Sequence, residues 1–284
     1  MPRQARLDAP GLLQHVMARG IERREIFKDD IDRRSFLDRL AVILEETQTQ
    51  CYAWALIPNH LHLLLRTTQA PLPTVMRRLM TGHAVTFNRR HRRAGHLFQN
   101  RYKSIVCEED NYLLELTRYI HLNPLRAGLV KDLKELDKYP WAGHSAIIGK
   151  CDNPLMPKSE GQALSVDKEI VFSKFHLESE KEEIDPENPV NPVKHDVVSL
   201  AEKTIEDVLL YFGEETEKAR KKYRQFVRDG IERGSRPELQ GGGLIRSSGG
   251  GKAGLLGRSS EERELADDRI LGSGDFVAGA LKKA

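Results

Sequence analysis

The first candidates for chemistry are two histidines that stand two residues apart. His60 and His62 follow a Pro-Asn turn, in a segment where histidine and leucine alternate as far as Leu65. Side chains two apart on a β-strand point to the same face, so this alternation puts both imidazoles on one side. Two neutral imidazoles side by side are a pair of metal ligands, although a catalytic site usually has a third protein ligand. The alternative is a half-buried strand with two incidental histidines.

A second stretch contains the groups that this pair lacks. Residues 116–124 are expected to form the end of a helix that closes near Pro124. Tyr119 and Asn123 stand four positions apart within it, so they share one face of the helix. A phenol can act as a nucleophile and an amide oxygen can bind a cation, so the two together could complete the site.

The elements that must position these groups follow the order β-α-β-β-α-β-α. We expect strands within residues 12–19, 51–57, 60–65 and 97–107, and helices over residues 30–46, 71–90 and 111–123. Asp29 or Asp30 is the expected cap of the first helix, and Asp110 that of the last. This order predicts an α+β fold of the ferredoxin-like type: a four-stranded antiparallel sheet with helices on one face and one extra helix.

Charge is distributed unevenly along the chain. Residues 1–150 contain 24 Lys and Arg against 16 Asp and Glu, whereas the remainder contains 21 against 26. The stretch 67–107 has eight basic residues and no acidic one. A basic front half is typical of a domain that binds a polyanion, and the alternative is a solvated helix face. The residues that we expect to contact nucleic-acid phosphates are Arg77, Arg78, Arg89, Arg90, Arg92, Arg93, Arg101 and Lys103.

Composition argues against several other classes of protein. No run of 18 apolar residues exists, so we expect no membrane span. The first residues are polar and no apolar stretch follows them, so no secretory signal is expected. Cys51, Cys107 and Cys151 lie far apart, which favours a reducing compartment over a disulfide framework or a zinc knuckle. We therefore expect a cytoplasmic protein.

The chain is expected to divide into three parts. Residues 1–150 hold the first domain, residues 151–196 form a polar, proline-bearing linker, and residues 197–284 form a helical and glycine-rich region. Within the last part, helices are predicted at residues 197–212, 214–233 and 259–271. Two runs of three glycines read as flexible connectors, because no Gly-Lys-Ser or Gly-Lys-Thr follows a strand as in a phosphate-binding loop.

In combination, these segments resemble the REP-associated tyrosine transposases, a branch of the HUH single-strand nucleases. The likeness covers about residues 10–150. It rests on four segments in a fixed order: Arg19-Gly20, IPNHLHLL at 57–64, GHLFQNRY at 95–102 and RYIHLNPLRAGLV at 118–130. The second half is similar to longer relatives through LQGGGLIRSSGG and RILGSGDFV. Some of those continue into a helix-turn-helix that this sequence does not show, so we expect a shortened form.

The resemblance implies both a fold and a mechanism. It implies a ferredoxin-like domain in which His60 and His62 hold Mg²⁺ or Mn²⁺. Asn123 matches the third ligand of the family, and Tyr119 matches its nucleophile. Family members nick and join single-stranded DNA, often next to a hairpin, through a tyrosyl–DNA intermediate. The partner expected here is therefore hairpin-containing single-stranded DNA, bound by a monomer or a homodimer.

Two alternatives to this transposase-type nuclease stay open. One is a domesticated relative that binds structured single-stranded DNA or RNA without cleaving it. The other is a metal hydrolase that uses water, with Tyr119 only in the core. His15, His121 and Arg118 are expected to be ordinary packing or polar residues. Tyr102 and Phe98 are expected either to stack on bases or to pack in the core.

Overall fold

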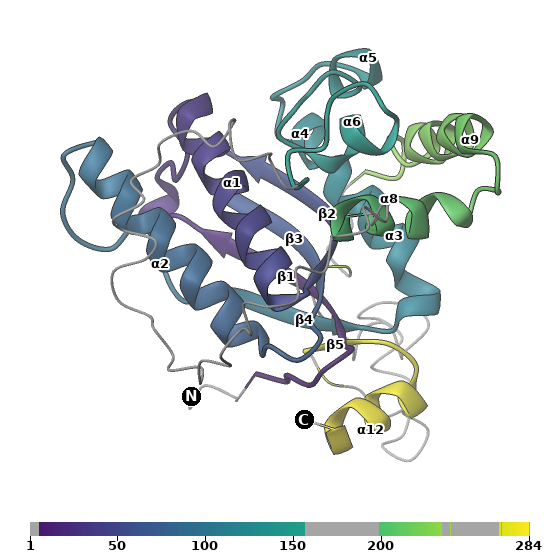
Figure 1. Cartoon of the computed structure of the whole chain (residues 1–284), viewed down its shortest axis with the longest axis horizontal. Helices are drawn as coiled ribbons and strands as arrows, with labels where there is room; N and C mark the ends of the chain where they lie inside the picture. Colours follow the sequence, from purple (N-terminus) through teal and green to yellow (C-terminus); the bar gives the residue numbers. More distant parts are fainter. Residues whose placement is uncertain (1–5, 157–198, 235–238, 240–266, 268, 284) are drawn as a thin grey trace, which may run out of the picture.

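The computed structural model describes residues 6–156, 199–234, 239, 267 and 269–283. Within them, a five-stranded sheet forms the centre of the molecule (Figure 1). Its strands, in spatial order, are β2 (Gln50–Ile57), β3 (His60–Arg66), β1 (Leu13–Arg19), β4 (Lys103–Cys107) and β5 (Ile270–Leu271). The first four pair antiparallel, whereas β5 runs parallel to β4. The predicted α+β, ferredoxin-like sheet is confirmed, with one C-terminal strand added at its edge.

Helices flank this sheet, and the C-terminal region adds more of them. Those described are η1 (Ile21–Arg23), α1 (Asp30–Thr47), α2 (Leu72–Arg90), α3 (Glu109–His121), α4 (Asn123–Arg126), α5 (Leu133–Leu136), α6 (Gly143–Ile147), α8 (Leu200–Leu210), α9 (Thr216–Asp229) and α12 (Gly274–Lys283). The two helices predicted from residue 197 to residue 233 are confirmed as α8 and α9. None of the helices in the described ranges is both long and apolar enough to cross a membrane.

The helix predicted over residues 259–271 is wrong at its end. Ile270 and Leu271 are β5, because they pair with Val106 and Cys107 and their backbone groups bond to the sheet. The part of that predicted helix before residue 267 lies outside the described residues. So do both glycine runs and the linker from residue 157 onward.

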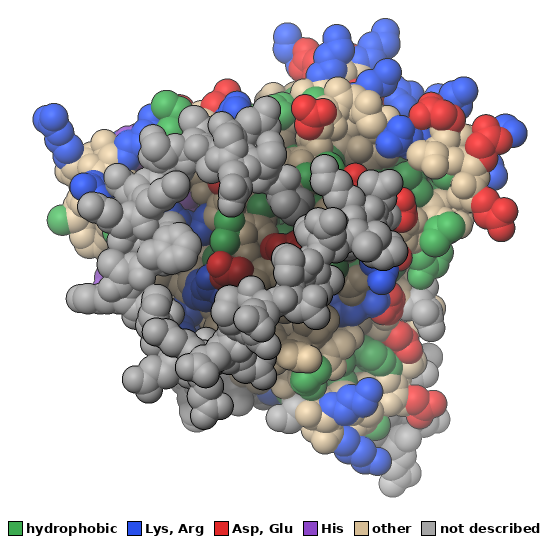
Figure 2. All heavy atoms as spheres, viewed as in Figure 1, with side chains coloured by type: hydrophobic (Ala, Val, Ile, Leu, Met, Phe, Trp, Pro, Cys, Tyr) green, Lys and Arg blue, Asp and Glu red, His purple; other side chains and the backbone are tan. Residues whose placement is uncertain are grey.

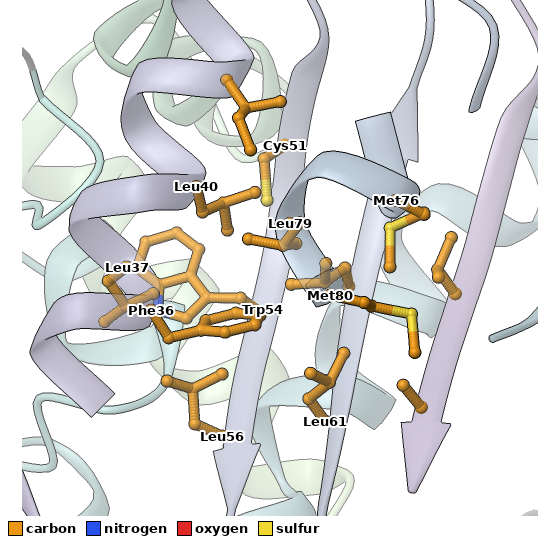
Figure 3. Packing of buried hydrophobic residues seen from close by; sticks show 14 of the residues in the cluster. Phe36, Leu37, Leu40, Cys51, Trp54, Leu56, Leu61, Met76, Leu79 and Met80 are labelled. Carbon is orange, nitrogen blue, oxygen red and sulfur yellow. The ribbon is translucent and has the colours of Figure 1, made fainter. Parts of the chain in front are cut away.

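One face of the sheet is covered by α1 and α2. The carboxylate of Asp29 caps α1 by accepting hydrogen bonds from two backbone amides of its first turn, as predicted. The apolar sides of both helices pack on the sheet, where they meet Trp54 and Leu61 (Figure 3). Leu63 and Leu65 point into the same core, so the expected alternation of β3 is confirmed.

The opposite face of the sheet is covered by α3, the extra helix of the prediction, whose position on the sheet the sequence left open. Leu64 of β3 and Ala53 of β2 belong to a second core together with Leu116 and Ile120 of α3. This second face is itself apolar, so a helix must shield it from water. The predicted cap is wrong: Asp110 lies inside α3, which starts after Glu108. The histidine pair and the tyrosine helix therefore occupy the same side of the sheet.

The C-terminal helices belong to this second core as well. Val208 of α8 and Tyr223 and Val227 of α9 are fully buried in the cluster that contains α3. Ser199 and Glu202 form a capping box at the start of α8. The helix that carries the candidate nucleophile is thus packed between the sheet and a part of the chain about 100 residues further on (Figure 1).

Two smaller features complete the sheet. The fourth strand, predicted within residues 97–107, is confirmed as β4, and the residues before it form an isolated bridge between Phe98 and Gly20. At the other edge, the backbone oxygen of Trp141 accepts a hydrogen bond from Leu56, so the Tyr-Pro-Trp segment packs the outer side of β2.

Candidate active site

His60 and His62 lie side by side on the face of the sheet that α3 covers. In the register of β1 on β3, His60 stands opposite Arg19 and His62 opposite Met17. The two imidazole centroids are 5.2 Å apart. His60 is half-buried, and His62 is only 4% exposed. The central position of β3 between β2 and β1 accounts for the burial of His62.

Tyr119 approaches this pair from α3. Its ring centroid lies 6.2 Å from that of His62 and 6.0 Å from that of His15, edge-on to both. The side chain is 5% exposed. The guanidinium carbon of Arg126 stands 4.8 Å from the centroid of the phenol ring, and Arg126 also donates a 2.9 Å hydrogen bond to the Tyr119 carbonyl. The phenol therefore lies between the buried imidazoles and a cationic side chain.

Asn123 is the first residue of α4, about one helical turn beyond Tyr119. Leu122 between α3 and α4 keeps helical backbone angles. Asn123 is 8% exposed, and no hydrogen-bond partner for its side-chain nitrogen lies among the described residues. Rotation of the carboxamide by 180° about the Cβ–Cγ bond exchanges its nitrogen and oxygen. The amide oxygen can then occupy this position and bind a cation.

Burial keeps these imidazoles neutral. It lowers the pKa of His60 to about 4, and the nearby Arg19 acts in the same direction. The pKa of His62 lies well below its ordinary value, chiefly through burial and then through His15 and His60. A neutral imidazole is the form that binds a metal ion, so both side chains are in the required state at neutral pH.

A chain of hydrogen bonds fixes the ring of His60. Asn59 donates through Nδ2 to the carbonyl oxygen of Arg23 at 3.2 Å, which turns its Oδ1 toward His60. His60 Nδ1 lies 2.6 Å from that oxygen and must therefore carry the hydrogen. In a neutral ring, Nε2 then keeps its lone pair. This arrangement is the one found behind most histidine metal ligands.

The donor set fits a divalent cation that binds few protein groups. No cluster of three His, Cys, Asp or Glu suited to a metal occurs among the residues that the structure describes. The side chain of Asn123 could offer an amide oxygen as a third ligand. Two imidazoles, an amide oxygen and waters suit Mg²⁺ or Mn²⁺.

The eight basic residues predicted to bind phosphate do not gather around these histidines. Six of them lie on α2 or just after it, and α2 covers the other face of the sheet. Arg78 forms an ion pair with Glu46, and Arg90 binds Asp29 and Asp32 with both distances at 2.6 Å. Those with exposed side chains are Arg77, Arg89, Arg90, Arg92, Arg101 and Lys103.

Lys103 is the predicted phosphate contact that shares the histidine face. It alternates with Ile105, which packs in the core under α3, so both point to that side. Its charge also acts on His15. Figure 2 shows further Lys and Arg side chains over α5, outside the predicted stretch, where Lys131 and Lys134 are exposed.

Sequence reasoning missed three residues around this site. His15, expected to be an ordinary packing residue, has its Nε2 3.0 Å from Nδ1 of His62. Arg19 and Arg126 bring positive charge close enough to act on His62. Arg19 could have been found, because a first strand that pairs with the histidine strand ends at this residue. The other two depend on pairing and packing that the sequence does not display.

Arg118, Tyr102 and Phe98 make packing contacts elsewhere in the protein. Arg118 is 3% exposed, bonds to Glu115 and lies over the ring of Phe226, away from the histidines. Tyr102 is 6% exposed in the core under α1 and α2, and Phe98 packs against the same core. Tyr102 is therefore a core residue, whereas Phe98 is only partly buried.

Residues 9–123 match the family model described as "Transposase IS200 like". The chain carries an IS200-like transposase domain. The matched range begins shortly before β1 and ends at Asn123, so it includes both histidines and Tyr119. No curated protein matches the sequence.

Two solved structures are similar to parts of this chain. One is a REP-associated tyrosine transposase bound to a REP hairpin, 13% identical, with a TM-score of 0.42 over 58% of this chain and 94% of that one. The other is a candidate transposase from Deinococcus radiodurans R1, 20% identical, with a TM-score of 0.31 over 42% and 95%. At these scores, neither structure supports an inference about the site.

Proposed function

We propose that the IS200-like domain nicks and rejoins single-stranded DNA through a covalent bond to Tyr119. The observation that carries this proposal is the meeting of two distant elements. The phenol of α3 lies with its ring centroid 6.2 Å from that of His62 on β3, which in turn adjoins His60. A nucleophile and two neutral metal-ligand side chains in one place are the parts that phosphodiester transfer needs.

Three groups would hold the cation: Nε2 of His60, Nε2 of His62 and the amide oxygen of Asn123. When bound, Mg²⁺ or Mn²⁺ withdraws charge from the phosphate oxygens and orients them for in-line displacement. Arg19 and Arg126 add fixed positive charge on the same side, where an anionic DNA strand must approach.

The covalent step balances without any other reactant. The oxygen of Tyr119 forms a bond to phosphorus as the ester bond to the departing DNA oxygen breaks. The phenolic proton passes to solvent, and the departing oxygen takes up a proton to become a free hydroxyl. By the family precedent this is a 3′-hydroxyl, and Tyr119 holds the 5′-phosphate. Attack by the same or another 3′-hydroxyl reverses the step and joins DNA ends without ATP.

The test is formation of a covalent protein–DNA adduct. The full chain is incubated with a hairpin-flanked single strand and Mn²⁺ or Mg²⁺, then separated on a denaturing gel. Tyr119→Phe should abolish the adduct and leave DNA binding intact. Tyr112→Phe is the matched control, because it removes a hydroxyl from the same helix α3. An undiminished adduct in Tyr119→Phe would exclude Tyr119 as the nucleophile.

A second candidate function is binding of structured single-stranded nucleic acid without cleavage. It is favoured by the burial of Tyr119, which leaves 5% of the side chain exposed. A gel shift without adduct at any metal concentration would establish this function in place of the first. Cleaved DNA with no attached protein would instead indicate a hydrolase that uses water.

A further inference from the structure

His15 links the histidine pair to the far end of the chain. It lies on β1 and is fully buried. Its Nδ1 is 3.2 Å from the carbonyl oxygen of Leu239, and its Nε2 is 3.0 Å from Nδ1 of His62. The planes of the two rings differ by 24° and their centroids are 5.2 Å apart. Three polar groups from three distant parts of the sequence thus form one line of hydrogen bonds.

The positions of the hydrogens in this line follow from the chemistry of its ends. A backbone carbonyl only accepts hydrogen bonds, so His15 Nδ1 must carry the hydrogen that points at Leu239. A buried ring whose partners are a carbonyl and another imidazole is neutral, since an uncompensated charge there is very costly. Nε2 of His15 then carries a lone pair and accepts a hydrogen bond, and the hydrogen between the two rings is bound to Nδ1 of His62.

The opposite arrangement is excluded by the same contact. If His62 carried its hydrogen on Nε2, His15 would have to donate from its own Nε2. A neutral His15 would then turn the lone pair of Nδ1 toward the oxygen of Leu239, and two acceptors would face each other at 3.2 Å in a buried place.

We propose that His15 is a positioning residue that holds His62 in the tautomer required of a metal ligand. By accepting the hydrogen of Nδ1, His15 leaves Nε2 of His62 with its lone pair. Asn59 does the same for His60, so both rings of the pair offer the same nitrogen. Leu239 contributes through its backbone, which gives the C-terminal half a part in the site. This inference rests on the proposed function for its purpose.

The direct test is the tautomer of His62 in the metal-free full-length protein. Long-range ¹H–¹⁵N correlation of ¹⁵N-histidine-labelled protein separates a protonated from an unprotonated ring nitrogen. We expect His62 and His60 both to be protonated at Nδ1 and unprotonated at Nε2. A hydrogen on Nε2 of His62 overturns the proposal, and this readout requires no variant to fold.

Variants of His15 test the consequence. His15→Phe keeps the ring volume but removes the acceptor, so Mn²⁺ affinity by titration calorimetry should fall about 10- to 100-fold, as for other partners behind metal ligands. His15→Gln keeps one acceptor and one donor and should restore most of the affinity. Equal Mn²⁺ affinity in wild type and His15→Phe would overturn the proposal.

His83→Phe is the matched control for loss of a buried histidine. His83 is 2% exposed and its Nε2 lies 2.8 Å from the carbonyl oxygen of Ile26, but it packs under α1 and α2 on the other face of the sheet. It should leave Mn²⁺ affinity unchanged. Failure of the adduct test with the predicted tautomer present would refute the nicking function alone, whereas an adduct together with the other tautomer would refute this inference alone.

Discussion

Two groups of histidine and tyrosine side chains lie on the two sides of α3, and they differ in what they can reach. The active-site group consists of His15, His60, His62 and Tyr119. The α9 group consists of His121, His144 and Tyr223 with Asp137 and Arg224. Both contain imidazoles and a phenol within a few ångströms of one another, and both include a residue of α3.

The rings of the α9 group do not reach solvent, and Nε2 of His121 and Nδ1 of His144 have no hydrogen-bond partner among the described residues. Nδ1 of His121 lies 2.6 Å from the hydroxyl of Tyr223, and Nε2 of His144 lies 3.0 Å from the carboxylate of Asp137. Arg224 completes the group by an ion pair of 2.8 Å with Asp137. His121, His144 and Tyr223 have no exposed surface, and burial raises the pKa of Tyr223 well above its ordinary value.

The active-site group comes nearest to solvent at half-buried His60. Nδ1 of His62 and Nδ1 of His60 are hydrogen-bonded to other protein groups, which leaves Nε2 of each ring for a ligand. The positive side chains of Arg19 and Arg126 act on His62. Residue types and spacing are therefore a poor guide by themselves. A functional site differs from a buried polar cluster in that a ring nitrogen near the surface keeps a lone pair that can bind a ligand. The following experiments test that distinction.

The largest effect should come from removing one histidine of each group. His62→Ala deletes a proposed metal ligand, so the single-turnover rate of adduct formation should fall at least about 100-fold. His121→Phe should leave that rate within about two-fold for the folded protein. It should lower the free energy of unfolding by about 2 kcal/mol instead, because Tyr223 loses its buried partner.

The outcome that contradicts this distinction is a reversal of the two effects. If His121→Phe removes adduct formation in a protein that still folds, as measured by urea unfolding, then the α9 group takes part in the chemistry. The comparison would in that case identify two sites and not one.

Acid should destabilise the folded protein through its buried histidines, including His15 of the active-site group and His83 on the other face of the sheet. Burial lowers the pKa of His15 and of His83 to about 4, whereas an unfolded histidine titrates near 6.5. Between these values the unfolded chain binds protons that the folded chain does not, so stability decreases as the pH falls from about 6.5 to 4. The free energy of unfolding in urea at pH 5 should be at least about 2 kcal/mol below its value at pH 7. His83→Phe should reduce this difference, and an unchanged pH dependence would show that these rings are not neutral by burial.

A smaller effect is expected from the ion pair of the α9 group. Asp137→Asn removes the charge that holds both His144 and Arg224. Arg224 is partly exposed and the pair is screened, so the loss should be about 1–2 kcal/mol in urea unfolding. The rate of adduct formation by the folded protein should not change. A lower rate in a variant that remains folded under the assay conditions would count against a purely structural α9 group.

The smallest effect concerns DNA affinity on the two faces of the sheet. Lys103→Ala, on the histidine face, should weaken single-strand binding several-fold and reduce the salt dependence by about one phosphate contact. Arg90→Ala should do less, because Arg90 is held by Asp29 and Asp32 on the other face. Fluorescence anisotropy at two salt concentrations measures both. A larger effect of Arg90→Ala would move the DNA path to α2.

The sequence predicts the parts of this molecule that depend on local periodicity. The alternation around His60 and His62 correctly indicates one strand with two different faces. The spacing of Tyr119 and Asn123 places them about one helical turn apart. The strand and helix order is also sufficient for the four-stranded sheet, because each element has a clear period and a clear end.

The rest depends on contacts between distant residues. The role of His15 requires the register of β1 against β3 and a carbonyl 224 positions away. The side of the sheet that each helix covers is likewise not encoded in its own periodicity, so the sequence does not show that the basic residues of α2 lie on the other face from the histidines. A strand as short as β5 has no period to detect and exists only because β4 offers an edge.

The most direct measurement is the identification of the residue that becomes attached to DNA. The full chain is trapped with a single strand and Mn²⁺, digested with protease and nuclease, and analysed by tandem mass spectrometry. A nucleotide on the oxygen of Tyr119 is the expected result. A nucleotide on any other residue, or cleaved DNA with unmodified protein, would contradict the joint site of His60, His62 and Tyr119.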